Sequence, residues 1–375
     1  MITLHAVGDL VLERDDAWPL VAQAAPVLAA ADVRVGHLEI PHIVDGLVQT
    51  TDVPALPGPP AALDALARAG FDVLTLAGNH VYDYGPEGIR STRALCAARG
   101  IRTAGAGETL DEAFAPAIVE ARGTRLGVVS VNAVGPRETW ATTLKPGAAY
   151  VEVVTHYEPA GANPGGPPRI DTRAEPRSRA RFEAAVAAAA ADVDVLVVAL
   201  HKGLVHVPAE IAAYEIELAH AAIDAGAHAV VGHHAHIFKG VEVYRGRPIL
   251  HGLGNFATVT RALATDDDAP ERAEWARRRR RLFGFDPDPA MPDYPFHPES
   301  RNTAIAMLGF SGADVSAALL PCWIDDEARV VPVADDSARG AAVRAYLRET
   351  TRDGGFATDF FDDDGLLHVR MDTQR

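Results

Sequence analysis

The sequence predicts an α/β sandwich, in which helices cover β-sheet, and three observations support this fold class. Short apolar runs alternate along the chain with alanine-rich amphipathic stretches. The loop after each apolar run is polar and rich in Gly, His, Asn and Asp. The chain has 375 residues, of which 48% are hydrophobic, and this is ample for a large core.

The expected strands are almost wholly apolar, which is typical of strands that are buried on both faces. They are residues 2–7, 73–77, 126–131, 193–200 and 229–231. Strands of this kind need a layer of helices on the sheet, so helices are expected between them.

The expected helices lie between these strands and are residues 61–69, 87–99, 179–190 and 208–225. The last has Pro208 in its first turn and stops at Gly226, both of which are typical helix boundaries.

Two segments interrupt the alternation, residues 159–176 and residues 258–300, and both are expected to be excursions or lids. In the C-terminal part, residues 311–375, we expect short strands, a helix over 337–349 and a turn at 360–365.

The charge balance excludes some classes of partner. Thirty-five Lys and Arg stand against 51 Asp and Glu, which gives a net charge of −16 that repels nucleic acid and anionic membrane surfaces. The arginine run 277–281 is interpreted as an exposed helix turn. With two distant cysteines, no leader pattern and no apolar run of membrane length, we expect a cytoplasmic protein with a small-molecule or peptide substrate. No pattern specifies an oligomeric state.

The segment Gly232-His233-His234-Ala235-His236, directly after an expected strand, is the strongest local signal for chemistry. In extended chain, residues i and i+2 point the same way. We therefore expect His234 and His236 to converge on one metal or catalytic centre, and His233 to point elsewhere.

Four other polar motifs lie at strand ends: Asp9, Glu39, the pair Asn79-His80, and His201. In an open α/β sheet the carboxyl ends of the strands gather at one edge, so these groups can meet there. Carboxylate oxygens with imidazole nitrogens form a mixed donor set that suits Mn, Zn or Fe and does not suit Ca. The sequence therefore predicts one or two divalent transition-metal ions at this edge, with weak binding or no metal as the alternative.

Six short motifs follow one another along the chain. They are Gly8-Asp9, Gly36-His37-Leu38-Glu39, Gly78-Asn79-His80-Val81-Tyr82-Asp83, His201-Lys202-Gly203, Gly232-His233-His234-Ala235-His236 and Leu253-Gly254-Asn255-Phe256. As a set they resemble the CapA family, which is named for poly-γ-glutamate capsule synthesis and looks like a branch of the calcineurin-like metallophosphoesterase fold. This resemblance implies a metallophosphatase-like sandwich of two sheets flanked by helices, with residues 1–310 as the catalytic domain and 311–375 as an extension packed on it.

The resemblance also implies a role for each matched residue. Asp9 and His236 would hold a first metal, and Glu39 would take the place of the bridging carboxylate. Asn79, His201 and His234 would hold a second metal. His80 would be the acid that protonates a leaving group.

The sequence departs from these patterns at two positions. Metallophosphoesterases carry a histidine two residues after the first aspartate, where this chain has Val11. The CapA pattern often has Asn where this chain has His37, which is a candidate substitute ligand.

Five further residues have two interpretations each. Asp83 orients His80 or caps the following helix, and Arg14 contacts an anion or forms a surface salt bridge. His251 lines the site or only occupies a strand. His297 and Arg301 contact the substrate, with His297 as a catalytic candidate, or are structural turn residues.

Three functions compete. The first is a metal-dependent hydrolase that acts on a phosphoester or on an amide or peptide bond. The second is a metal-independent peptide epimerase, an isomerase in which Asp9 or His80 faces His297 as the opposed acid and base. The third is a noncatalytic polymer- or peptide-binding protein.

Overall fold

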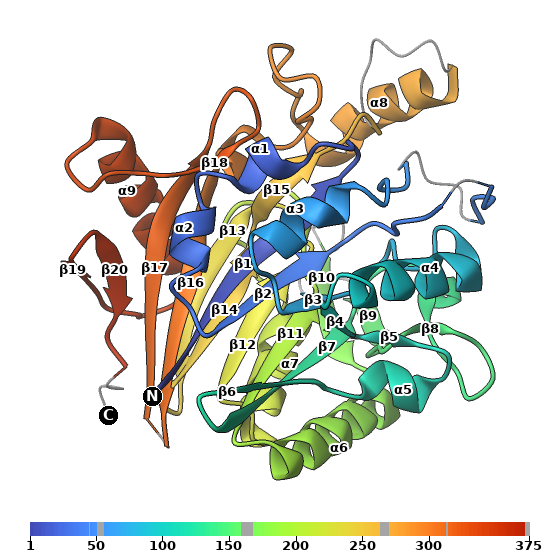
Figure 1. Cartoon of the computed structure of the whole chain (residues 1–375), viewed down its shortest axis with the longest axis horizontal. Coiled ribbons are helices and arrows are strands. Elements are labelled where there is room, and N and C mark those ends of the chain that lie inside the picture. Colours follow the sequence, from blue (N-terminus) through green and yellow to red (C-terminus); the bar gives the residue numbers. More distant parts are fainter. Residues whose placement is uncertain (45, 51–55, 159–167, 263–269, 313, 372–375) are drawn as a thin grey trace.

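The computed structural model describes residues 1–44, 46–50, 56–158, 168–262, 270–312 and 314–371. Two sheets lie face to face, and helices cover the outer face of each (Figure 1). This arrangement confirms the predicted α/β sandwich.

The larger sheet is mixed. Among the described residues its main path is β19 (Phe360–Asp363), β20 (Leu366–Val369), β17 (Asp314–Ile324), β16 (Asn302–Ser311), β1 (Ile2–Leu12), β2 (Val33–Leu38), β3 (Val73–Thr75) and β4 (Arg102–Ala104). Beside this path, β15 (Asn255–Val259) pairs with β1, and β18 (Val330–Pro332) pairs with β17. Strands β1 to β4 are parallel, whereas β16 is antiparallel to β1.

The smaller sheet has the order β13 (Phe238–Tyr244), β14 (Arg247–Leu253), β12 (Ala229–His233), β11 (Val195–His201), β7 (Thr124–Asn132) and β6 (Ala117–Ala121). Its four middle strands are parallel. Two short pairs lie outside both sheets. They are β5 (Ala106–Gly107) with β8 (Gly147–Ala148), and β9 (Val153–Glu158) with β10 (Arg169–Ala174).

Side chains alternate between two apolar layers along each central strand. In β11, Val195, Val197 and Ala199 face the other sheet, whereas Leu196 and Val198 face the outer helices. Both sets are buried, because the strand is covered on both sides. The all-apolar runs therefore predicted these strands correctly.

Helices cover each outer face. α1 (Trp18–Val21), α2 (Ala25–Leu28), α3 (Ala62–Arg68) and α4 (Gly85–Ala97) pack on the larger sheet. α5 (Leu110–Phe114), α6 (Pro176–Asp192) and α7 (Ala213–Asp224) pack on the smaller one. In the C-terminal part, α9 (Ala338–Asp353) adds Val343 and Leu347 to the inner core. The chain also forms α8 (Pro270–Phe283) and the 3₁₀ turns η1 (Arg137–Thr139) and η2 (Pro298–Arg301).

Three expectations about elements need correction. α7 begins at Ala213 and not at Pro208, because His206 and Ala209 adopt left-handed backbone that a helix cannot contain. The expected turn at 360–365 is a hairpin of β19 and β20 that turns at Asp364 and Gly365. Of the excursion 159–176, residues 169–174 form β10, and 159–167 lie outside the described residues.

Candidate metal centre

The carboxyl ends of strands from both sheets meet at one edge of the sandwich. Within the larger sheet Asp9 of β1 is paired with His37 of β2, and within the smaller sheet His201 of β11 is paired with His233 of β12. All four side chains are buried. The predicted convergence of strand ends is what the structure contains.

A glycine sets the approach of β15 to β1. A Cβ at Gly8 would lie 1.9 Å from the carbonyl oxygen of Gly254, so any larger residue would push the strands apart. The same close approach lets the Asp9 amide donate to the Gly254 carbonyl at 2.8 Å. Gly8 therefore fixes the position of the Asp9 carboxylate.

Two groups of donor atoms in the described residues are close enough to hold a metal ion. One consists of Asp9, His37 and His201, the other of Asp9, Glu39 and His236, and the atoms of each group lie within 4.8 Å of one another. Asp9 belongs to both. The geometry therefore gives Asp9 the shared position that the resemblance assigned to Glu39, and it places His37, the candidate substitute ligand, among the donors.

Asn79 and His234 meet at His201. Asn79 Oδ1 lies 2.7 Å from His201 Nε2, and His234 Nδ1 lies 3.1 Å from the same nitrogen. The three residues that the resemblance implied for a second metal are thus brought together.

The expectation that His233 points away from the centre is wrong. Its Nδ1 lies 3.1 Å from Asp9 Oδ1, and its ring stacks on that of His37 with centroids 4.9 Å apart. The alternation of an extended chain stops here, because His234 and His236 have positive φ angles of 88° and 53°. All three histidines of the motif therefore face the centre.

The carboxylates of Asp9 and Glu39 and the imidazole of His236 form a charged triad. His236 Nε2 lies 3.1 Å from Glu39 Oε1, and its Nδ1 lies 3.4 Å from Asp9 Oδ2. Burial lowers the pKa of His236, but the charges of Glu39 and Asp9 outweigh this effect and raise the pKa to about 9. Burial likewise raises the pKa of Glu39, and His236 overcomes that effect to bring it to about 2.

Burial is the main cause of the pKa shifts of the other groups in the centre. It raises the pKa of Asp9 and holds the pKa values of His37 and His201 well below their usual range. The pKa of His234 falls to about 4 through burial and the charge of His236. Neutral imidazoles are the form that binds a metal.

Unpaired atoms show that the donors fit a cation. His37 Nδ1 contacts the Thr75 hydroxyl at 3.0 Å, and its buried Nε2 has no hydrogen-bond partner. Buried Glu39 Oε2 also has none. A Cβ at Gly78 would lie 3.2 Å from His37 Nε2 and 3.4 Å from His201 Nε2, so the glycine leaves space beside both nitrogens. A divalent ion in each donor group would give the unpaired atom of that group a partner and would balance the carboxylate charge.

His80 lies beside the centre and is held by Asp83. Its Nδ1 is 2.7 Å from Asp83 Oδ2, and the imidazole is 22% exposed. Burial lowers the pKa of His80, but Asp83 and then Glu39 outweigh it and raise the pKa. Of the two roles open to Asp83, the structure shows the contact that orients His80.

The segment 284–301 covers the centre. The Phe296 ring lies 4.9 Å from that of His236, and Tyr294 accepts a hydrogen bond from Asn255 Nδ2 at 3.0 Å. Asn255 Oδ1 in turn contacts His236 Nδ1 at 2.8 Å. The predicted excursion 258–300 thus contacts the candidate centre through Tyr294 and Phe296, and its residues 263–269 lie outside the described residues.

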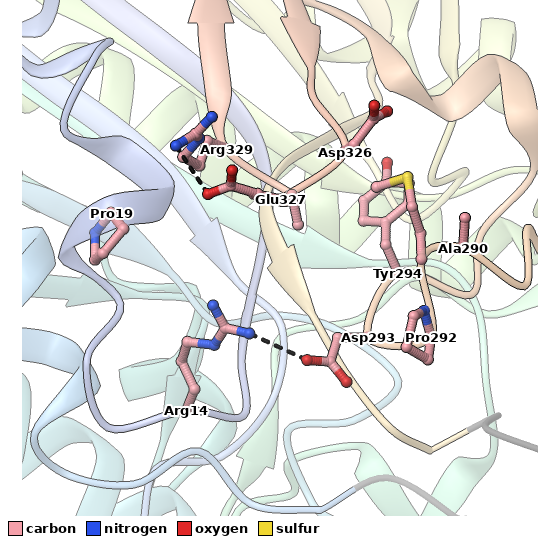
Figure 2. Close-up of a pocket in the computed structure, with 11 residues that line it drawn as sticks. Arg14, Pro19, Ala290, Pro292, Asp293, Tyr294, Asp326, Glu327 and Arg329 are labelled. Carbon is pink, nitrogen blue, oxygen red and sulfur yellow. Dashed lines mark hydrogen bonds and ion pairs between the residues drawn. The ribbon is translucent and has the colours of Figure 1, made fainter. Parts of the chain in front are cut away.

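Four predicted residues lie away from the donor atoms. Arg14 forms an ion pair of 3.1 Å with Asp293 at a separate cavity of about 260 Å³, where Figure 2 shows the two side chains pointing toward each other. Arg301 contacts the Ile324 carbonyl at 2.7 Å and lies over Trp323.

His251 is fully buried against Glu242 and Phe356, which corrects its assignment as a substrate contact. His297 packs on Phe285, with ring centroids 4.9 Å apart.

His206 is a neighbour of the centre that the sequence did not identify. Its ring stacks beside that of His236 with centroids 5.5 Å apart, and it is 5% exposed. Its backbone is left-handed, with φ 59°, so no strand or helix periodicity indicated its direction. The only sequence signal was its position five residues after His201.

Sequence comparisons relate the chain to capsule proteins. A family model described as bacterial capsule synthesis protein PGA_cap matches residues 3–260. A probable polyglutamine synthesis accessory protein of Mycobacterium tuberculosis is 30% identical over 258 residues, which cover 66% of this chain and 61% of the relative. The PGA biosynthesis protein CapA of Bacillus subtilis is 29% identical over 266 residues, which cover 68% of this chain and 63% of the relative. The chain thus spans less than two thirds of the length of these relatives.

Structural comparison finds more distant similarity. A calcineurin-like phosphoesterase of Bacillus subtilis has a TM-score of 0.36 and 12% identity, with 94% of this chain and 97% of that chain covered. A putative 5′-nucleotidase of Staphylococcus aureus has a TM-score of 0.41 and 12% identity, with 93% and 58% covered. Within the described residues, no helix is long and apolar enough to cross a membrane.

Proposed function

Because this chain belongs to the bacterial capsule synthesis protein family PGA_cap, with a match over more than half its length, we propose that it is a metal-dependent hydrolase of that family. Its substrate would carry a phosphoester or an amide or peptide bond. The observation that supports the proposal is the pair of buried donor groups, Asp9 with His37 and His201 and Asp9 with Glu39 and His236, in each of which the donor atoms lie within 4.8 Å of one another.

The residues of the centre would have two roles, metal binding and proton transfer. Asp9, shared by both donor groups, would hold the cation or cations with the surrounding imidazoles and Glu39. Such an ion supplies a hydroxide nucleophile at neutral pH, because it lowers the pKa of water. His80, partly exposed and oriented by Asp83, would give its proton to the leaving group.

Metal content tests this proposal. Protein purified without added metal, and protein after addition of Mn²⁺ or Zn²⁺, would be measured by mass spectrometry and calorimetry. We expect one or two ions per chain. We also expect His37→Ala and His236→Ala each to lose metal, since each side chain belongs to one of the two donor groups. The control, His220→Ala, removes a helix imidazole that contacts Glu242 at 2.7 Å and should leave metal content unchanged. A wild-type chain that binds no ion would contradict the proposal.

An epimerase is the second candidate, and one contact favours it. The segment over the centre carries His297, whose imidazole packs against the same Phe285 ring that lies 5.1 Å from the ring of His206. Through Phe285 and His206 this contact connects His297 to His236, the side of the centre where the epimerase would need an acid or base that acts on the substrate. Incubation of a peptide in heavy water separates the two candidates, because an epimerase exchanges deuterium at the inverted carbon without bond cleavage. Cleavage without exchange supports the hydrolase.

A further inference from the structure

A buried arginine of α8 lies near the centre with most of its hydrogen-bonding capacity unused. Arg279 is 1% exposed, and its Nε and Nη1 atoms have no partner. Its Nη2 atom donates to the carbonyl of Pro295, which precedes Phe296. A guanidinium has five N–H donors, so three of them remain without an acceptor in the interior. Buried cations are ordinarily paired, and an unpaired one calls for a ligand.

Aromatic rings connect this arginine to the metal centre. Its guanidinium carbon lies 4.8 Å from the centroid of the Phe285 ring. That ring is 5.1 Å from His206, and His206 is 5.5 Å from His236. Arg279 also donates to the Pro295 carbonyl, and the ring of the next residue, Phe296, lies 4.9 Å from that of His236. The arginine is thus two ring contacts away from a candidate metal ligand.

His206 adds a third unpaired nitrogen to the same cluster. Its buried Nδ1 has no partner, and Arg279 is close enough for its charge to act on the imidazole. The cluster of Arg279, His206, Phe283, Phe285 and Phe296 therefore combines apolar rings with two polar side chains that still have unpaired nitrogens. No carboxylate of the described residues forms an ion pair with Arg279.

We propose that Arg279, with His206 beside it, binds an oxyanion group of the substrate, a carboxylate or a phosphate, next to the metal centre. This inference rests on the proposed function, because it names the substrate class of the same site. The exposed Arg277 and Arg281 of α8 would help to attract such an anion, although the whole chain carries a net charge of −16. Arginine suits this role because its planar, always charged fork matches carboxylate and phosphate oxygens.

Binding of two simple anions tests the proposal. Inorganic phosphate and acetate would each be titrated by calorimetry into wild type, Arg279→Met and the control Arg280→Met. Arg280 lies on the same helix, is exposed and pairs with Asp286. We expect Arg279→Met to weaken binding of at least one anion by about 10- to 100-fold, the usual effect of losing a hydrogen bond to a charged group. Arg280→Met should bind as the wild type does.

The two anions distinguish the source of the oxyanion. A loss confined to phosphate supports a phosphoryl group of the substrate, and a loss confined to acetate supports a carboxylate. A loss for both supports a site that recognises either group. Unchanged binding of both anions in Arg279→Met, or no binding by the wild type, would overturn the proposal.

Two further measurements keep the result interpretable. The urea midpoint of Arg279→Met should equal or exceed that of wild type, because an apolar side chain replaces an unpaired buried charge. If this variant does not fold, His206→Phe is used in its place, since it keeps a ring at that position. It should weaken binding of the same anion. Metal content is measured on every variant. A chain without metal refutes the hydrolase, whereas normal metal content with unchanged anion binding refutes only the role of Arg279.

Discussion

At the scale of single residues, His80 is the group whose contacts most directly suggest proton transfer. It is fixed on one ring nitrogen by Asp83, and about a fifth of its imidazole reaches the surface. It lies next to Asn79 in sequence but belongs to neither donor group. Its removal should therefore affect chemistry and leave metal binding intact.

We expect His80→Ala to keep the fold and the metal while turnover falls by roughly 10²- to 10⁴-fold, the usual contribution of general acid catalysis. Turnover would be compared on an alkyl ester and on a nitrophenyl ester, which needs no proton on its leaving group. The nitrophenyl ester should lose much less. Asp83→Asn, which leaves the imidazole in place, should reduce turnover to a smaller extent. Equal rates for His80→Ala and wild type on both esters would remove His80 from the mechanism.

The sequence predicted most of this centre because its residues follow strands whose ends meet. Asp9, Glu39, Asn79, His201, His234 and His236 all lie at or just after such ends and come together in the structure. His233 was misplaced because the alternation rule assumes extended backbone, and the two positive φ angles after it break that rule. His206 was missed because its position depends on a loop. Arg279 was missed because the run 277–281 was interpreted as an exposed helix turn, whereas α8 buries this arginine.

At the scale of elements, a buried ion pair joins the end of β11 to the start of α7. Lys202 Nζ lies 3.0 Å from Glu215 Oε2, and both side chains are at most 1% exposed. The other Glu215 oxygen accepts from the Ala212 amide at 2.8 Å, where the helix begins. The pair therefore positions α7 and also the strand end that carries His201.

We expect Lys202→Met to lower the free energy of unfolding by about 3 to 5 kcal/mol, because it leaves the Glu215 carboxylate buried without its cation. The double variant Lys202→Met/Glu215→Leu should recover much of that loss. Urea unfolding measures both, with Arg90→Met as a control whose exposed pairs with Glu87 and Glu108 contribute little. A single variant as stable as wild type would show that the buried pair does not hold α7.

The predicted bounds of an element agree with the structure where burial alone determines them. The strand over 126–131 was predicted to within two residues of β7, because both of its faces are covered. The start of α7 was predicted wrongly. A proline is permitted in the first turn of a helix, but here a left-handed residue, Ala209, follows Pro208 directly, and the helix begins only at Ala213. Local backbone conformation of this kind depends on contacts that the sequence pattern does not contain.

At the scale of the whole molecule, several histidines are buried in neutral form, and this makes stability depend on pH. His42 is fully buried and contacts the Pro59 carbonyl at 2.9 Å, and burial lowers its pKa to about 4. Unfolded histidine has a pKa of about 6.5. Between these values the unfolded chain binds more protons, so the contribution of His42 is present above about pH 6.5 and is lost as the pH falls toward 4.

We therefore expect the urea midpoint to decrease as the pH is lowered from 7 to 5. Over the whole range between the two pKa values of His42, this residue accounts for up to about 3 kcal/mol of the free energy of unfolding. The variant His42→Gln should show a flatter dependence over the same range, since its side chain does not titrate. Parallel urea titrations at several pH values make the comparison. Identical slopes for the two proteins would show that His42 does not contribute.

The position of β1 in the larger sheet governs the order in which this chain can fold. β1 lies between β2 and β16, and Ile2 pairs with Phe310. On the ribosome the first strand can join β2 early, but its other edge stays open until almost the whole chain has emerged. Open strand edges favour wrong pairings, and contacts between residues so distant in sequence form slowly. Synthesis of this protein thus includes an interval in which one edge of its central strand is unpaired and open to wrong pairing.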